Sequence, residues 1–383
     1  MSRHFRPMAR RWQSSSPSCW VRFSLTRAPS EACVFPGPTF QWWVANGLWL
    51  YEGLSEVLGA VVSWGVPDWI GRLYLGSLLG NRDLAVAIAV GGVVYVGFCL
   101  WEIRMSPRLH LQLYGIRQHQ WGQVHRLGGY RPMVFMDHGL MVSFWMAVST
   151  LIAGWLGYAR SVARLGPVPV GAAFMALLAT TVLCKSAGAL ALLLLGGGAL
   201  FLSTASAWRW VLVGLALLPA VYGVGRVSGA FKGEQLVAVA AAVSDERAAS
   251  LDFRLKSEKL LIERALEQPI LGWGGYSRSA VLDPDTDKYL AVQDGLWIAV
   301  LGEGGFVRLI FYLLLGALPV LLALGAIGQG PISSPGLAPL AVLAVVLALY
   351  TVDCLFNAMI NPVYMLIAGS ITTVALRRRE SLR

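Results

Sequence analysis

Nine residues that could carry charge, move a proton or hydrogen-bond a substrate lie within or at the ends of apolar segments. They are Asp137, His138, Lys185, Arg226, Asp294, Glu303, Asp353, Asn357 and Asn361. Polar groups in such segments are costly to bury in a membrane and usually serve a function, although hydrogen bonding between helices is an alternative use. The orientation argued below places them near one membrane boundary, whereas a secondary transporter concentrates its polar residues at the midplane. The pattern therefore indicates a site that opens at one face of the membrane.

A strongly basic stretch covers residues 104–132. Its five arginines are Arg104, Arg108, Arg117, Arg126 and Arg131, and no Asp or Glu occurs from Ile103 to Met136. Arginine forks bind phosphate oxygens well, so the stretch predicts contact with an anion such as a lipid phosphate or the pyrophosphate of a lipid carrier. An error of one in the number of spans is the alternative, since it would move the stretch to the opposite face. No nucleic-acid-binding motif is visible, so nucleic acid is not an expected partner.

Long apolar segments must position these residues. Hydrophobic residues make up 56% of the 383 residues and charged residues 14%, about half the charged share of a soluble domain. A membrane-spanning helix needs roughly 20 residues. Apolar segments that fit lie at about 84–103, 133–158, 166–184, 186–204, 208–227, 306–327, 337–356 and 358–376. The stretch 295–303 is too short to span and predicts a half-helix dipping from the surface. The predicted fold is an all-α, polytopic transmembrane helical bundle.

Residues 228–294 form the one sizeable polar segment, which we expect to be a large periplasmic loop. Within it, 253–267 has the spacing of an amphipathic helix, which Pro269 ends. Its predicted apolar residues are Phe253, Leu260, Leu261 and Leu266, and its predicted exposed pair is Lys259 and Glu263. The run Gly-Trp-Gly-Gly at 272–275 predicts a turn.

The two ends of the chain are less regular. We expect 1–41 to be disordered or to follow a wrongly chosen start codon, and 42–83 to be an interfacial or partial membrane segment. The basic run at 377–379 follows the last span, and positive residues prefer the cytoplasm, so 377–383 is expected to be a cytoplasmic tail. Counting back through the spans places 159–165 in the cytoplasm and 228–294 in the periplasm. The basic stretch 104–132 then falls on the periplasmic side, against the rule.

Several motifs in the same order resemble the O-antigen ligase/polymerase superfamily of bacterial membrane proteins. Residues 254–276 (RLKSEKLLIERALEQPILGWGGY) resemble its Arg-led helix, proline and Gly-x-Gly turn in a large periplasmic loop. The segments 293–306 (QDGLWIAVLGEGGF), 183–189 (LCKSAGA) and 353–362 (DCLFNAMINP) resemble further family elements. The resemblance covers roughly residues 70–376. The chain departs from the ligases of this superfamily at the pair Gln293-Asp294, because the first residue of the pair in those ligases is His. The chain therefore resembles a diverged member.

The resemblance implies a glycosyltransferase of the inner membrane that acts in O-antigen or exopolysaccharide synthesis. The donor would be a glycan on a polyprenyl-pyrophosphate carrier, the acceptor a hydroxyl on a lipid or another glycan, and membrane lipids would surround the protein. Cations must stabilise the leaving pyrophosphate, and a base can take the acceptor proton. The candidates for pyrophosphate binding are Arg254, Lys185, Arg126 and Arg131. The candidate catalytic bases are Asp294 and, as the alternative, His138.

Other interpretations stay open. No metal motif is visible in the sequence, and the resemblance implies that neither a metal nor another cofactor is needed. Arg254 could instead pair with Glu258 on its own helix, and Asp294 could cap the half-helix that follows it. For the whole chain, the alternatives are a transporter of lipid-linked saccharides and a non-catalytic membrane subunit of a polysaccharide assembly system.

Overall fold

The computed structural model describes residues 50–381, apart from 118–124, 127, 203–204, 243, 276, 284, 287 and 329. The predictions for 1–41 and for the first part of 42–83 lie outside the described residues. The described chain is predominantly helical, with two short antiparallel hairpins. The hairpins are β1 (His125–Arg126) with β2 (Gly129–Tyr130) and β3 (Arg164–Leu165) with β4 (Val168–Pro169).

The apolar segments predicted as spans form helices at nearly the predicted positions. In chain order they are α4 (Leu78–Met105), α6 (Gly139–Tyr158), α7 (Val170–Leu183), α8 (Ala187–Gly197) continued by η4 (Gly198–Leu202), α9 (Ala205–Val227), α12 (Leu296–Ile327), α13 (Ala338–Asp353) and α14 (Pro362–Ser381). Four of them, α4, α6, α9 and α12, are long and apolar enough to cross a membrane. Every residue of α13 is buried, so this helix lies at the centre of the bundle.

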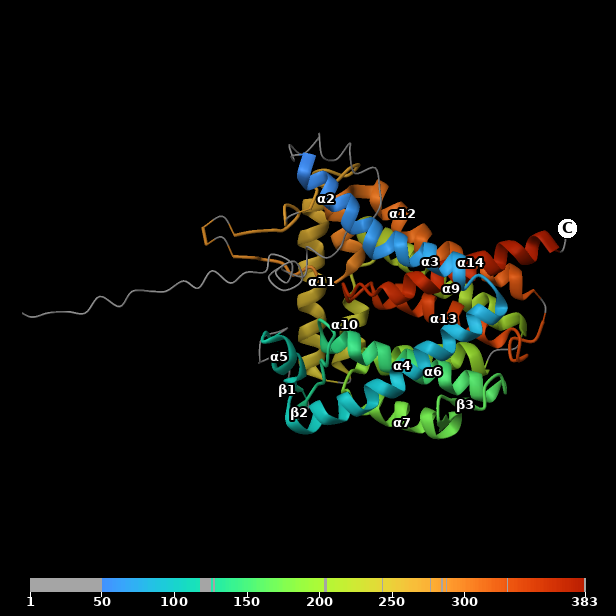
Figure 1. Ribbon diagram of the computed structural model, residues 1–383. Helices are drawn as coiled ribbons and strands as arrows, with labels where there is room; N and C mark the ends of the chain where they lie inside the picture. Colours follow the sequence, from blue (N-terminus) through green and yellow to red (C-terminus); the bar gives the residue numbers. More distant parts are fainter. Residues whose placement is uncertain are drawn as a thin grey trace, which may run out of the picture.

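The loops gather at two ends of the bundle (Figure 1). At one end, Arg82 donates to Ser161 O (3.4 Å), Ser161 Oγ donates to Pro335 O (3.0 Å) and Arg377 donates to Gly76 O (3.0 Å). These contacts bring the start of α4, the turn after α6, the loop before α13 and the end of α14 together. The other end holds β1 and β2, the turn between α7 and α8, and the described parts of the long segment 228–295, as the alternation of spans predicts.

Helix α12 bends at Gly305, where the backbone has a φ of 61°. Beyond the bend, Phe306 N donates to Pro269 O (2.7 Å) and Val307 N to Ile270 O (3.3 Å). Before it, the carbonyls of Gly302 and Glu303 accept from Trp273 N (2.9 Å) and Gly274 N (2.8 Å). The predicted break between a half-helix and a longer helix is therefore confirmed, and the Gly-Trp-Gly-Gly turn supplies partners for the interrupted backbone.

The segment before α4 is more regular than predicted. Helices α2 (Leu50–Ala60), η2 (Val61–Gly65) and α3 (Val66–Tyr74) follow one another without a break, through one π-helical turn. Gly71 and Gly369 allow α3 to pass close to α14, because a side chain at either position would meet backbone atoms of the other helix. Glu56 of α2 and Glu303 both pair with Arg308, which is fully buried, at 3.2 and 3.1 Å. This ion-pair cluster ties α2 to the bent helix.

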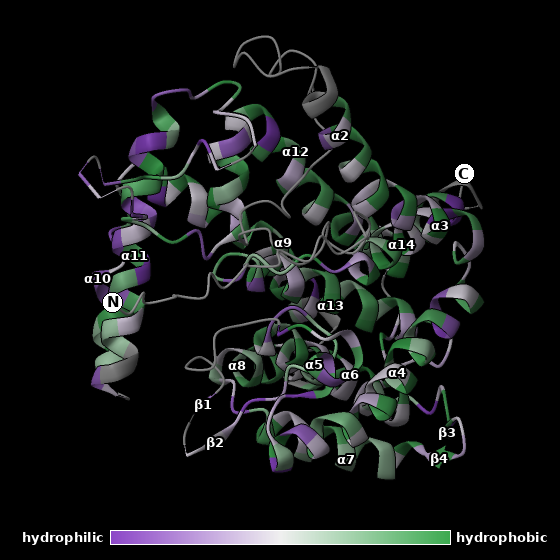
Figure 2. Cartoon of the chain, turned by 60° about the vertical axis from the view of Figure 1, so that its left-hand side comes forward, coloured by the Kyte–Doolittle hydropathy of each residue, from purple (hydrophilic) through white to green (hydrophobic). Residues whose placement is uncertain are grey.

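Helix α11 (Asp245–Leu266) runs across the end of the bundle rather than along it (Figure 1). It begins eight residues before the predicted start at 253. Lys259 and Glu263 are exposed as predicted. The predicted apolar face is only partly correct: Leu261 is buried, but Phe253, Leu260 and Leu266 are exposed. The buried face also holds Leu255, Glu258, Ile262 and Ala265, so the helix turns a face containing a carboxylate toward the bundle. Figure 2 shows more hydrophilic residues along α11 than along α6 or α13.

Candidate functional site

Arg254 and Asp294 meet at the loop-rich end of the bundle. Arg254 Nε lies 3.2 Å from Asp294 Oδ2, and Arg254 Nη1 donates to the carbonyl of Phe356 at 3.2 Å. Both side chains are about one-third exposed, at 33% and 35%. The two residues are therefore partnered but reachable from outside, and they connect α11, the start of α12 and the segment after α13.

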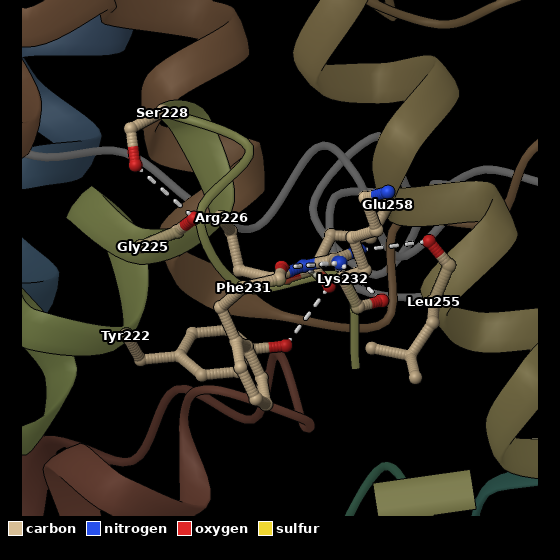
Figure 3. Close-up of polar contacts among 8 residues, drawn as sticks. All are labelled: Tyr222, Gly225, Arg226, Ser228, Phe231, Lys232, Leu255 and Glu258. Atoms are coloured by element: carbon tan, nitrogen blue, oxygen red, sulfur yellow. Dashed lines mark hydrogen bonds and ion pairs between the residues drawn. The ribbon is translucent and has the colours of Figure 1, made fainter. Parts of the chain in front are cut away.

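Arg226 fixes the helix that carries Arg254 (Figure 3). Its Nε donates to Glu258 Oε2 at 3.0 Å, and Tyr222 OH donates to the same oxygen at 2.9 Å. Its two Nη groups donate to carbonyls of residues 231, 232 and 255 at 2.9–3.2 Å. Arg226 thus holds both the turn after α9 and the middle of α11. Glu258 is occupied by Arg226, so the alternative pairing of Arg254 with Glu258 does not occur.

Asp294 is held by the backbone around it. Gly295, not Asp294, is the N-cap residue of α12, and no side chain caps this helix. A side chain at Gly295 would collide with the carbonyl oxygen of Leu355, and Leu296 N donates to Cys354 O at 2.8 Å. The start of α12 therefore lies directly against the segment after α13. The Asp294 carboxylate points to Arg254 instead of capping the helix.

A small pocket opens beside the pair. Its lining includes Arg254, Glu258, Asp294, Ile298 and Phe356, and its volume is about 20 Å³. Such a volume holds a water molecule or two, so a sugar or a pyrophosphate must bind over the pocket or widen it. A carboxylate and a guanidinium on one apolar-walled opening can take a proton and bind an anion, respectively.

Burial affects both carboxylates of this region. It raises the pKa of Asp294 above its ordinary value, and the neighbouring Arg254 guanidinium partly offsets that effect. Burial also raises the pKa of Glu258, with Arg226 and the Tyr222 hydroxyl acting in the opposite direction. A carboxylate with a raised pKa is a stronger base than a solvated one, which suits Asp294 for accepting a proton.

Lys185 and Arg131 lie together beside the β1–β2 hairpin. Lys185 occupies the turn between α7 and α8 with a φ of 53°, and its carbonyl accepts from Arg131 Nη2 at 3.2 Å. The Lys185 Nζ lies over Gly129, where a side chain would collide with it. Neither Lys185 nor Arg131 lines the pocket beside Arg254. The structure therefore brings Lys185 and Arg131 together, whereas Arg254 lines the pocket without them.

Two predicted site residues remain, His138 and Arg126. His138 is the N-cap of α6, and its Nδ1 accepts from Leu140 N at 3.0 Å. Arg126 belongs to β1 and pairs with Gly129 across the hairpin, while its side chain lies outside the described residues. The sequence did not predict how Arg254 is positioned. Its helix is held by the contacts of Tyr222 and Arg226 with Glu258, and its side chain donates to the Phe356 carbonyl. The one signal in the sequence was Arg226, an arginine within a predicted span.

Within the described ranges, no group of three or more His, Cys, Asp or Glu side chains could hold a metal ion. Comparisons with protein-family models and with curated proteins found no match to the chain.

Proposed function

We propose that the chain is a glycosyltransferase of the bacterial inner membrane that transfers or polymerises a glycan carried on polyprenyl pyrophosphate. The site would face the periplasm, and the product would belong to O-antigen or exopolysaccharide synthesis. The observation that carries the proposal is the meeting of Arg254 and Asp294 at one partly open pocket. An anion-binding group and a base are the two groups that this reaction requires.

In the proposed reaction, an acceptor hydroxyl attacks the anomeric carbon of the donor sugar. A new C–O bond forms as the bond between that carbon and the phosphate oxygen breaks, and the pyrophosphate leaves with the electron pair. Asp294 takes the hydroxyl proton. Arg254 stabilises the charge on the leaving group, and among the described residues no partner occupies its Nη2, which is available for a phosphate oxygen.

Lys185 and Arg131 are proposed to bind the pyrophosphate further from the pocket. Both are at the same end of the bundle as Arg254, and they lie close together, since Arg131 Nη2 donates to the Lys185 carbonyl at 3.2 Å. Two cations at this position would favour a doubly charged phosphate. The broken backbone at Lys185, between two short apolar helices, is the kind of irregularity that membranes tolerate where it is covered by protein or lines a cavity.

The proposal is tested by glycan transfer from a lipid-linked donor in purified membranes. Arg254→Ala should lower the rate about 10²–10³-fold, by analogy with the loss of an oxyanion donor. Arg254→Lys should recover part of it, because the charge returns without the planar fork. Lys256→Ala removes an exposed cation two residues away and is the matched control. Unchanged transfer by Arg254→Ala at normal expression would exclude Arg254 from the mechanism and favour a non-catalytic membrane subunit.

The proposed orientation has a separate test. A reporter that is active only in the periplasm should be inactive when fused after Arg383 and active when inserted in the exposed loop near Asp285. The opposite pattern would place the candidate site in the cytoplasm and contradict the proposed donor.

A further inference from the structure

We propose that the end of α4 and the short helix α5 (Leu109–Tyr114) bind the headgroups of anionic phospholipids. The surface consists of Trp101, Arg104, Met105, Arg108, Leu113 and Tyr114, all of them exposed. We refer to it as the α4–α5 surface. The inference requires that α4 crosses the membrane, as proposed above, and it is independent of the transfer chemistry.

Helix α4 carries an apolar stripe that leads to this surface. Val94, Phe98, Trp101 and Met105 are exposed at 57%, 38%, 37% and 56%. Their spacing of four, three and four residues places them on one face of the helix. Phe135 covers part of Phe98, with ring centroids 5.5 Å apart, and the rest of the stripe is open to the lipid tails that surround a spanning helix. Trp101 and Tyr114 lie near the end of the stripe, where amphipathic rings favour the membrane interface.

Cations follow where the stripe ends. Arg104 shares the last turn of α4 with Met105, and Arg108 precedes α5. Both are exposed, and neither has an ion-pair partner among the described residues. Arginine side chains at the end of a spanning helix reach the headgroup level while their stems stay on apolar surface. The position thus combines contact with acyl chains and contact with phosphates.

The carboxylate nearest in the sequence, Glu102, is occupied by the backbone instead of these arginines. Glu102 is 1% exposed, and its oxygens accept from Leu109 N (3.0 Å), Met133 N (2.8 Å) and Val134 N (2.7 Å). The three backbone bonds turn the carboxylate into the protein and hold the basic loop against α4. His110 Nδ1 lies 3.0 Å from Ile116 O, which closes α5 back on itself. Residues 104–117 therefore form a shaped, positively charged surface rather than an extended chain.

An anionic lipid fits this surface better than a free phosphate does. The charge would satisfy an inorganic anion equally well, but the adjoining apolar stripe offers nothing to it. A phospholipid uses both parts at once. Basic residues near an anionic membrane surface are each worth about a fivefold gain in affinity, so two arginines should contribute roughly 25-fold. Binding of anionic lipid would also explain why a basic loop lies on the expected periplasmic side, where the positive-inside rule disfavours arginine and lysine.

The test is a titration of the detergent-solubilised chain with fluorescent phosphatidylglycerol and, separately, fluorescent phosphatidylcholine. The chain should prefer phosphatidylglycerol. The double variant R104Q/R108Q should lose at least about tenfold of that preference, whereas R104K/R108K should keep most of it, because the attraction depends on charge. The double variant K256Q/K259Q removes two exposed cations from α11 and should bind like the parent chain.

Two results would overturn the proposal. One is an unchanged preference for phosphatidylglycerol in R104Q/R108Q. The other is displacement of phosphatidylglycerol by inorganic phosphate or pyrophosphate at matched ionic strength, which would identify a site for a free anion. The R104K/R108K variant separates lost charge from lost folding: weak binding by both double variants, together with a lowered melting temperature, would show that the arginines stabilise the loop and would count against the lipid site.

Discussion

Arg226 Nε and Glu258 Oε2 lie 3.0 Å apart and join the end of α9 to the middle of α11. Glu258 stands four residues after Arg254, one helical turn away on the same helix. The ion pair is buried, with side-chain exposures of 6% and 10%. The position of Arg254 relative to the bundle therefore depends on Arg226, which does not itself line the pocket.

Removal of Arg226 should destabilise the chain. Arg226→Ala leaves Glu258 as a buried carboxylate without its cation and also removes donors to three carbonyls, a change that typically costs about 3–5 kcal/mol. Lys259→Ala breaks an exposed pair at 3.9 Å and should cost well under about 1 kcal/mol. Thermal unfolding of both variants in detergent measures the difference. Equal melting temperatures would show that the ion pair does not hold α11.

The transfer rate should fall on the acid side of its pH profile because of Asp294. A base works when ionised, and burial raises the pKa of Asp294 above its ordinary value, so the rate should decline as the pH falls through that raised value. Asp294→Asn should lower the rate and abolish the acid limb. The control is Asp283→Asn, since Asp283 does not line the pocket and its pKa is lowered by hydrogen bonding to the backbone of Asp285. If Asp294→Asn keeps the acid limb of the pH profile, another titratable group causes that limb.

A side chain at Gly272 should disrupt the contact between the loop and the bend of α12. Gly272 has a φ of 68°, and a Cβ there would lie 2.5 Å from the carbonyl carbon of Glu303. Gly272→Ala should therefore cost more than the roughly 1–2 kcal/mol of the left-handed conformation alone. Gly229 also has a positive φ, of 74°, but a Cβ there would meet open space. Gly229→Ala is therefore the control that measures the conformational cost without a collision. A larger drop in melting temperature for Gly272→Ala is expected, and similar drops would mean that the loop moves away freely.

Glu102 should control the exposure of the basic loop to protease. Glu102→Gln keeps the shape but replaces one acceptor oxygen by an amide donor, so the three backbone N–H groups cannot all be satisfied. Charge-assisted bonds of this kind contribute about 1.5–3 kcal/mol each. Trypsin should cut after Arg104, Arg108 or Arg117 faster in this variant than in the parent chain or in Glu263→Gln, which alters an exposed carboxylate. An unchanged cleavage rate would show that other contacts hold the loop.

The sequence determined the helical framework. Apolar segments of about 20 residues predicted the apolar helices from α4 to α14 to within about six residues, because the length and composition of such segments are local properties. The short helices α5 and α10 (Glu234–Ala241) were not predicted, and α11 begins eight residues before its predicted start. The bend at Gly305 was predicted for the same reason, since the interruption Gly-Glu-Gly-Gly is visible in the chain. Arg254 and Asp294 were both singled out as candidate site residues, through the order of motifs that resembles a known superfamily.

Only the tertiary structure decided how these residues are held and which of them meet. The hydrophobic spacing of α11 did not predict which of its faces is buried. Arg226 and Tyr222 of α9 donate to the Glu258 carboxylate and so compensate for its burial against the bundle. From the sequence, Asp294 was equally suited to cap α12. In the structure the N-cap is Gly295, which packs against Leu355, and the Asp294 carboxylate pairs with Arg254. Lys185 contacts Arg131 through its backbone carbonyl and does not line the pocket beside Arg254. Such pairings depend on contacts between residues far apart in the sequence, which local spacing does not encode.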